Sequence, residues 1–233
     1  PEAGRYTVVL EPDLSVSGIP LASGYLHGSV STGGVARFTG RLPQGSAFTF
    51  SSRLQATSRI AMYKVIKQRG SVVSEFCGRI GFDALPGGMI LVDGGLVWRN
   101  LPRLNQIIVP TPFVAMLEAN GSLYSRPVPP ERILSLPQAA TMYKLVIEGS
   151  FGAPLERWLR IDLQNVVIID PITDANIRIS FNQRLGQVKG SFVDEATGRR
   201  FELNGVVVQA AHSMGGGIKR GNEVGRFSVV PRL

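Results

Sequence analysis

The sequence is poor in the residue types that build most catalytic and metal centres. It contains one cysteine, Cys77, and two histidines, His27 and His212. No disulfide can therefore form within the chain, and a zinc site of the usual His/Cys composition would need distant carboxylates to complete it. No apolar run approaches the ~20 residues that cross a bilayer as a helix. Pro1 is not a translation start, so we expect a processed protein or an excised fragment.

The single cysteine lies inside a predicted strand, residues 71–82. Free cysteine behaves as a small hydrophobic residue and is among the most buried residue types. We therefore expect Cys77 to be a buried strand residue, with a reactive thiol as the alternative.

Turn-forming residues are abundant, with 27 glycines and 15 prolines in 233 residues. In the stretch 177–209, turns at 184–186 and 194–198 separate three runs of residues. Apolar and polar residues alternate in these runs, as they do in β-strands with one buried face. Hydrophobic residues make up 44% of the chain, which is enough for a sizeable core. These features predict a β-meander rather than a helical protein.

The same pattern extends along most of the chain. We expect strands at 6–10, 25–31, 35–42, 46–54, 60–66, 71–82, 89–98, 142–148, 158–163, 166–170, 177–182, 187–193, 200–209 and 225–230. Between the two groups, residues 100–137 hold seven prolines, which favours a long connection or edge strands because proline cannot donate to a ladder. Within it, residues 113–117 and 122–124 are predicted to form a hairpin around the Asn120–Gly121 turn.

These strands predict an all-β, mainly antiparallel fold of about 14 to 17 strands, closed as a barrel or packed as two sheets. The expected organisation is a meander over 1–99, a proline-rich connection over 100–137 and a second meander over 138–233, or one continuous domain. Residues 34–42 and 186–192 are both glycine-flanked strands with interleaved basic residues. This likeness indicates either two similar halves produced by duplication or a pattern common to any meander.

A resemblance rests on glycines and alternating apolar positions across residues 5–233. The motifs include Gly24-Tyr25, the run from Phe38 to Leu42, Met62-Tyr63, Leu96-Val97-Trp98 and the run from Gly205 to Gln209. They resemble a β-rich module near the C-termini of large secreted or surface proteins of Verrucomicrobia-like and Planctomycetes-like bacteria. The resemblance implies a secreted or cell-surface bacterial location and other domains of a larger parent protein as neighbours. It implies no catalytic residue.

Two motifs imitate known sites without their full requirements. Ser213 follows His212 and precedes glycines, but a nucleophile elbow needs glycine two residues before the serine and a histidine later in the chain. We expect a hairpin loop there instead. Residues 215–217 precede Lys219 but lack the Gly-Lys-Ser/Thr and helix of a phosphate loop.

An oxygen-rich loop carries Asp170, Asp174 and Asn176, whose spacing could hold Ca²⁺. Turn formation alone also favours aspartate and asparagine at such positions, so both interpretations stay open. We predict no cofactor, no metal and no catalytic residue, and the chain is not expected to be an enzyme.

The net charge of +8 suits an anionic partner, although the basic residues are scattered rather than clustered. Tryptophans and tyrosines at 63, 98, 124 and 158 are predicted to be packing residues, with a sugar-stacking platform as the alternative. The candidate binding residues are Arg37, Arg41, Lys189, Arg199, Arg200, Trp98 and Trp158. The sequence favours a structural or adhesive module, and the alternative is binding of acidic polysaccharide or another anionic polymer in a salt-sensitive way.

Overall fold

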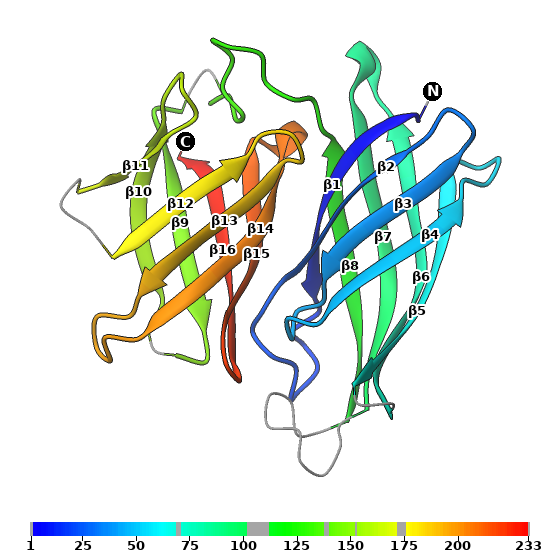
Figure 1. Cartoon of the computed structure of the whole chain (residues 1–233), viewed down its shortest axis with the longest axis horizontal. Helices are drawn as coiled ribbons and strands as arrows, with labels where there is room; N and C mark the ends of the chain where they lie inside the picture. The colour runs from blue at the N-terminus through cyan, green and yellow to red at the C-terminus, as the bar shows by residue number, and fades with distance from the viewer. Residues whose placement is uncertain are drawn as a thin grey trace.

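The structure is a computed structural model that describes residues 2–68, 71–101, 112–137, 140–151, 153–171 and 176–232. These residues form sixteen strands and two single-turn 3₁₀ helices, η1 (Pro86–Gly88) and η2 (Gln209–Ala211). The all-β prediction is confirmed, and the strands form two antiparallel sheets that lie side by side (Figure 1). No helix in these segments is long and apolar enough to cross a membrane.

The first sheet contains the first eight strands. They are β1 (Gly4–Pro12), β2 (Gly24–Val30), β3 (Val35–Arg41), β4 (Ala47–Arg53), β5 (Arg59–Gln68), β6 (Ser71–Ala84), β7 (Ile90–Asn100) and β8 (Phe113–Leu123). The second sheet contains β9 (Met142–Gly149), β10 (Leu155–Ile161), β11 (Val167–Asp170), β12 (Ile177–Asn182), β13 (Gln187–Val193), β14 (Arg200–Val208), β15 (Ser213–Arg220) and β16 (Glu223–Arg232).

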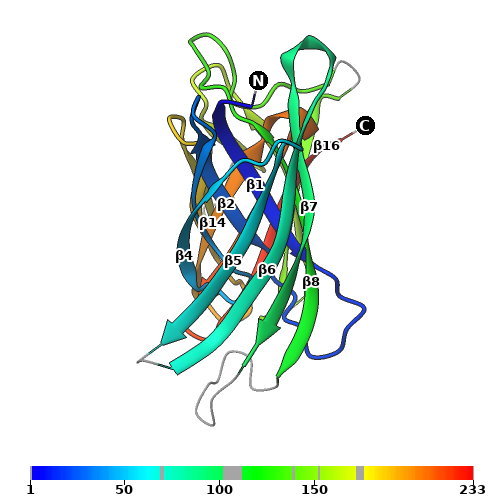
Figure 2. The same ribbon diagram turned by 90° about the vertical axis from the view of Figure 1, so that its right-hand side faces the viewer.

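Both sheets follow one cyclic order. With one exception in each sheet, consecutive strands pair with each other, and the first strand of each sheet also pairs with the last, β1 with β8 and β9 with β16. Each sheet thus curls into a nearly closed barrel, as the view of the first one shows (Figure 2). The ring stays unpaired at one seam, between β4 and β5 in the first barrel and between β11 and β12 in the second.

The two similar glycine-flanked strands predicted from the sequence are β3 and β13, and the strand order gives their positions in the barrels. β3 is the third strand of its barrel, whereas β13 is the fifth strand of the other. The two strands therefore occupy different positions in two barrels that share the same cyclic order.

Period-two alternation fills each barrel with apolar side chains. In β3, Ala36 and Phe38 are buried while Arg37 and Thr39 face outward. The first core contains Trp98, Phe76 and twenty-two other buried residues, and a separate cluster around Leu145 fills the second barrel. Charged side chains consequently collect on the outer faces.

The two barrels meet through β1 and β2 of the first and β14 and β15 of the second. A small apolar cluster of Val9, Tyr25, Val206 and Val208 is buried there. Beside it, the Thr7 hydroxyl donates a hydrogen bond to the carbonyl oxygen of Val207. Parts of the outer faces of these strands are thereby removed from solvent, which holds the barrels together.

The segment after β8 adds polar contacts across this junction. The Tyr124 hydroxyl donates to the carbonyl of Gln183 at 2.6 Å, and burial raises the pKa of this tyrosine to about 12. The Gln209 side chain accepts from the Ser125 amide at 2.8 Å and donates to the Ser125 carbonyl at 2.9 Å. The described part of the connection therefore packs against both barrels.

One predicted local structure is wrong, and a second is only partly right. Residues 113–124 form no hairpin, because β8 runs straight through Asn120 and Gly121 and pairs with both β7 and β1. The hairpin loop expected at 211–216 is confirmed only in its first part, because residues 209–212 connect the antiparallel pair β14 and β15 while β15 already begins at Ser213 and continues through three glycines. β8 thus belongs to the first sheet although it lies within the expected connection.

Cys77 corrects a third expectation. It is exposed on the outer face of β6, where Phe76 and Ile80 point into the core. Phe76 occupies the inward position, so the period-two alternation places the next residue outside.

Candidate anion-binding cleft

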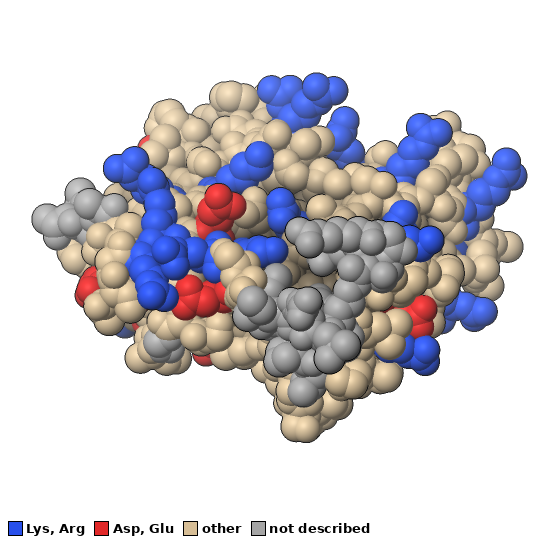
Figure 3. All heavy atoms as spheres, turned by 60° about the horizontal axis from the view of Figure 1, so that its bottom comes forward, with Lys and Arg blue, Asp and Glu red and all other residues tan. Residues whose placement is uncertain are grey.

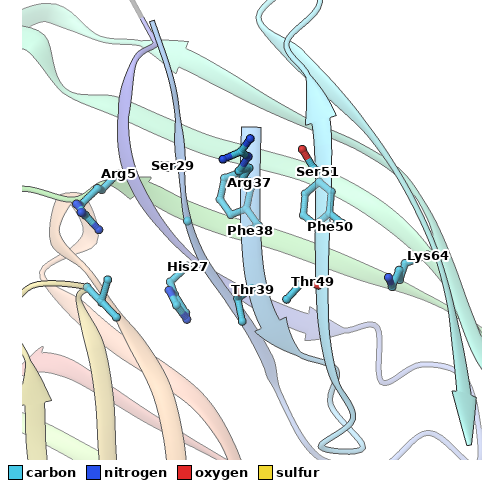
Figure 4. Close-up of a pocket in the computed structure, with 12 residues that line it drawn as sticks. Arg5, His27, Ser29, Arg37, Phe38, Thr39, Thr49, Phe50, Ser51 and Lys64 are labelled. Atoms are coloured by element: carbon cyan, nitrogen blue, oxygen red, sulfur yellow. The ribbon is translucent and has the colours of Figure 1, made fainter. Parts of the chain in front are cut away.

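A hollow of ≈ 620 Å³ runs across the outer face of the first barrel, beside the second barrel. Its charged side chains are Arg5 of β1, Arg37 of β3 and Lys64 of β5, and His27 of β2 lies among them (Figure 4). Leu185, in the turn between β12 and β13, closes it from the second barrel. We call this hollow the cationic cleft.

Strand register places the polar side chains of the cleft in two rows. The arginine row runs across four strands as Arg5, Ser29, Arg37 and Ser51, each opposite the next. The threonine row runs beside it as His27, Thr39 and Thr49. Because outward side chains of neighbouring strands stand beside one another, four strands build a continuous polar surface.

Lys64 reaches the cleft from the other side of the seam. It shares the inward-facing positions of β5 with the buried Met62 and Ile66, yet it is only half-buried. The first barrel is unpaired between β4 and β5, and Lys64 lines the cleft together with Phe50 and Ser51 of β4. Lys64 thus adds a third cation to the cleft from across the open seam.

The cleft is electrostatically one-sided. None of its lining residues is acidic. Among the described residues, no carboxylate forms an ion pair with Arg5, Arg37 or Lys64. Three neighbouring positive charges without internal partners attract an anion, and the recessed surface screens them less than open solvent would.

His27 adds a neutral hydrogen-bonding group to the cleft. Its Nε2 lies 2.7 Å from the side-chain nitrogen of Gln187, so a neutral ring accepts a hydrogen bond from that amide. Burial lowers the pKa of His27, and the nearby charge of Arg5 lowers it further. The ring is therefore neutral at neutral pH, and the positive charge of the cleft comes from the arginines and the lysine.

The cleft contains only one of the predicted binding residues, Arg37. Arg41 lies nearby at the barrel junction, where its Nη1 donates to the Gly45 carbonyl at 3.0 Å. It also lies close to Lys219, whose pKa is lowered by burial and by Arg41, with Glu202 acting in the opposite direction. Arg41 thus serves the packing of the junction.

The other predicted cations belong to the second barrel. Lys189 is exposed on β13. Arg199 forms an ion pair with Glu223 at 3.5 Å, and the Nε of Arg200 donates to the Ser191 hydroxyl at 3.2 Å. Basic side chains predominate on the face shown in Figure 3 and are spread over it rather than gathered in one patch.

The aromatic platform is not assembled. Trp98 is fully buried in the first core, where its Nε1 donates to the Ser74 hydroxyl at 2.8 Å, so we remove it from the candidate binding residues. Tyr124 is buried as well, whereas Tyr63 is 67% exposed on β5. Trp158 lies in the other barrel, on β10.

Trp158 lines a second hollow of ≈ 450 Å³. The guanidinium carbon of Arg232 lies 4.4 Å from the centre of its ring. The carboxylates of this hollow come from Glu156, Asp170 and Glu195. This second hollow is thus mainly acidic, which is opposite in character to the cationic cleft.

The metal and nucleophile motifs stay incomplete. Asp170 is exposed and Asn176 half-buried, while Asp174 lies outside the described residues. The described segments contain no group of three or more His, Cys, Asp or Glu side chains that could hold a metal ion. The Nδ1 of His212 faces the Ser135 carbonyl at 2.8 Å and the Ser135 hydroxyl at 3.4 Å, not Ser213.

Sequence reasoning missed Arg5, His27 and Lys64. For Lys64 a signal exists, because a charged residue at an inward position of an amphipathic strand is an informative exception. Arg5 and His27 carry no such signal, since only the pairing of β1 with β2 and the approach of Gln187 bring them into the cleft.

Comparison with protein-family models, curated proteins and solved structures finds no match for this chain.

Proposed function

We propose that this chain is a non-enzymatic adhesive module that binds an anionic polymer in the cationic cleft. The observation that carries the proposal is the set of Arg5, Arg37 and Lys64, three cations in one hollow without a carboxylate among its lining residues. Serine and threonine hydroxyls lie between these charges and offer hydrogen bonds to polar groups of the ligand.

A binding role agrees better with these residues than a catalytic one. His27 is the cleft's histidine, and the Gln187 amide already occupies its Nε2. The other histidine, His212, faces Ser135 rather than a nucleophile in a hollow. General acid–base chemistry needs a titrating group within reach of the reacting atom, and these contacts do not supply one.

We also propose that the module works on the outside of a bacterial cell, as part of a larger secreted or surface protein. The resemblance of its glycine pattern to such modules supports this location. A purely structural role is the second candidate. It is favoured by the barrel junction, where the cluster around Val206 and the Thr7–Val207 hydrogen bond join two filled barrels.

Paired substitutions separate the two roles. Arg5→Gln with Arg37→Gln removes two charges from the cleft, and Arg160→Gln with Arg178→Gln removes two exposed charges of the second barrel, so both variants have the same net charge. Binding to heparin would be measured at low and at physiological salt. We expect the cleft variant to lose about tenfold in affinity, which corresponds to two charge contacts of about 0.7 kcal/mol each.

The control variant should bind like the parent chain after correction for net charge. Equal losses in both variants would show that affinity depends on total charge and not on the cleft. An absence of binding to heparin by the parent chain at low salt would leave the structural role as the better candidate.

A further inference from the structure

Resting on the proposed function, we propose that the cleft selects an acidic polysaccharide whose charged groups recur on every second sugar unit. The ligand lies across the strands, from Arg5 on β1 towards Lys64 on β5. The order of the side chains along the arginine row, and not the total charge of the cleft, determines this selectivity.

Cations and hydroxyls alternate by strand. Arg5, Arg37 and Lys64 come from β1, β3 and β5, whereas Ser29 and Ser51 come from the intervening β2 and β4. Paired strands are about 4.8 Å apart, so the backbones of Arg5 and Arg37 are separated by about 10 Å. A ligand crossing the four paired strands meets Arg5, Ser29, Arg37 and Ser51 in turn, and Lys64 lines the same hollow beyond the unpaired seam.

A polysaccharide of alternating acidic and neutral units fits this order. An extended sugar unit is about as long as one strand spacing, so successive units lie over successive strands. An acidic unit then faces each cation, and a neutral unit places its hydroxyls over Ser29 or Ser51. Serine hydroxyls donate and accept hydrogen bonds, which matches sugar hydroxyls.

The threonine row extends this surface in the second direction. Thr39 and Thr49 form the next outward-facing pair after Arg37 and Ser51, two residues further along β3 and β4. Next to them, His27 keeps one ring nitrogen on Gln187 and has a second nitrogen for the ligand. A sugar ring that lies over the arginine row therefore also contacts the hydroxyl and imidazole groups of the threonine row rather than apolar groups.

The cleft does not suit single-stranded nucleic acid. Such ligands bind through bases stacked on exposed aromatic rings, together with a basic groove. The aromatic residues of the cleft are Phe38 and Phe50, and their rings stack on each other with centroids 5.5 Å apart. Phe38 is buried and Phe50 half-buried, so the rings belong to the barrel core. We therefore assign the polysaccharide rather than nucleic acid.

The test compares two oligosaccharides with equal numbers of carboxylates. Hyaluronan fragments carry a carboxylate on alternate sugars, whereas polygalacturonate fragments carry one on each sugar. We expect the parent chain to bind hyaluronan several-fold more tightly at physiological salt. Ser29→Ala should reduce this preference, and Ser180→Ala, an exposed strand serine of the second barrel, should leave it unchanged.

Each other outcome is decisive. Equal or tighter binding of polygalacturonate would overturn the alternating-charge assignment, while loss of that binding in the Arg5→Gln, Arg37→Gln variant would still uphold the proposed function. Tighter binding of a single-stranded oligonucleotide of equal charge would overturn the polysaccharide assignment. Failure of all three probes to bind at low salt would overturn both proposals.

Discussion

Gly217 of β15 lies against the carbonyl oxygen of Ser23 in the first barrel. A Cβ atom at this glycine would lie 2.6 Å from that oxygen, closer than two such atoms can approach. At this point the junction therefore depends on the absence of a side chain. The backbone of one barrel touches the backbone of the other.

Gly217→Ala should therefore destabilise the chain by about 1–3 kcal/mol, because neither backbone atom can move without disturbing its sheet. Urea unfolding measures the change. Gly215→Ala is the matched control on the same strand, since its Cβ would lie 3.4 Å from the nearest atom, the Phe227 carbonyl oxygen. A control as unstable as the Gly217 variant would show that alanine disturbs β15 itself rather than the junction.

The buried indole of Trp98 gives a second prediction. Ser74→Ala leaves its Nε1 hydrogen without the Ser74 acceptor and should cost about 1–3 kcal/mol. Adding Trp98→Phe removes the unsatisfied donor but leaves a smaller ring. The double variant should lose less unfolding free energy than the sum of the losses in the two single variants. A double-mutant cycle from chemical denaturation measures this coupling. Strict additivity would contradict the buried hydrogen bond.

Stability should depend on pH through His27. Its pKa in the folded chain is lowered from the usual 6.5 by burial and by Arg5, so the unfolded chain takes up the proton first. Stability is therefore fully present above about pH 6.5 and declines as the pH falls toward the lower folded pKa. Unfolding free energies measured between pH 7.5 and about pH 5 should show this decline. His27→Gln should flatten the curve in this window, and an unchanged slope would argue against it.

The reactivity of Cys77 tests which residues of β6 face outward and which face the core. Because Cys77 is exposed, a thiol reagent should modify it in the native chain nearly as fast as in urea-unfolded chain. Phe76→Cys in a Cys77→Ser background is the comparison, since position 76 points into the core. Strong protection of Cys77 would show that the outer face of β6 is covered in solution.

The sequence was sufficient to predict the fold class because local alternation and turn residues carry that information. Residues 35–42 alternate cleanly, and β3 (Val35–Arg41) agrees closely. β15 was missed because its three glycines have no side chains to alternate. The signal there is steric, as Gly216 faces the backbone of Gly205 and Gly217 faces Ser23.

The cleft could be predicted only in part because it depends on pairing between distant segments. Arg37 stands out locally as an outward cation on an amphipathic strand. Its combination with Arg5 and Lys64 requires the register of β1, β2 and β3 and the seam between β4 and β5. None of these is encoded in a short window. Trp98 is buried, as the packing interpretation predicted, but its place among the candidate binding residues was wrong because its burial depends on the partner strand that carries Ser74.

The pairing of the first and last strands has a consequence for assembly. In each barrel the first and last residues lie close together, because the start of β1 pairs with the end of β8 and the start of β9 pairs with the end of β16. A barrel of this kind could be inserted into another protein, or repeated in tandem, without rerouting the host chain. Modular shuffling would require only short linkers beside the paired first and last strands, and the strand order inside each barrel would stay unchanged.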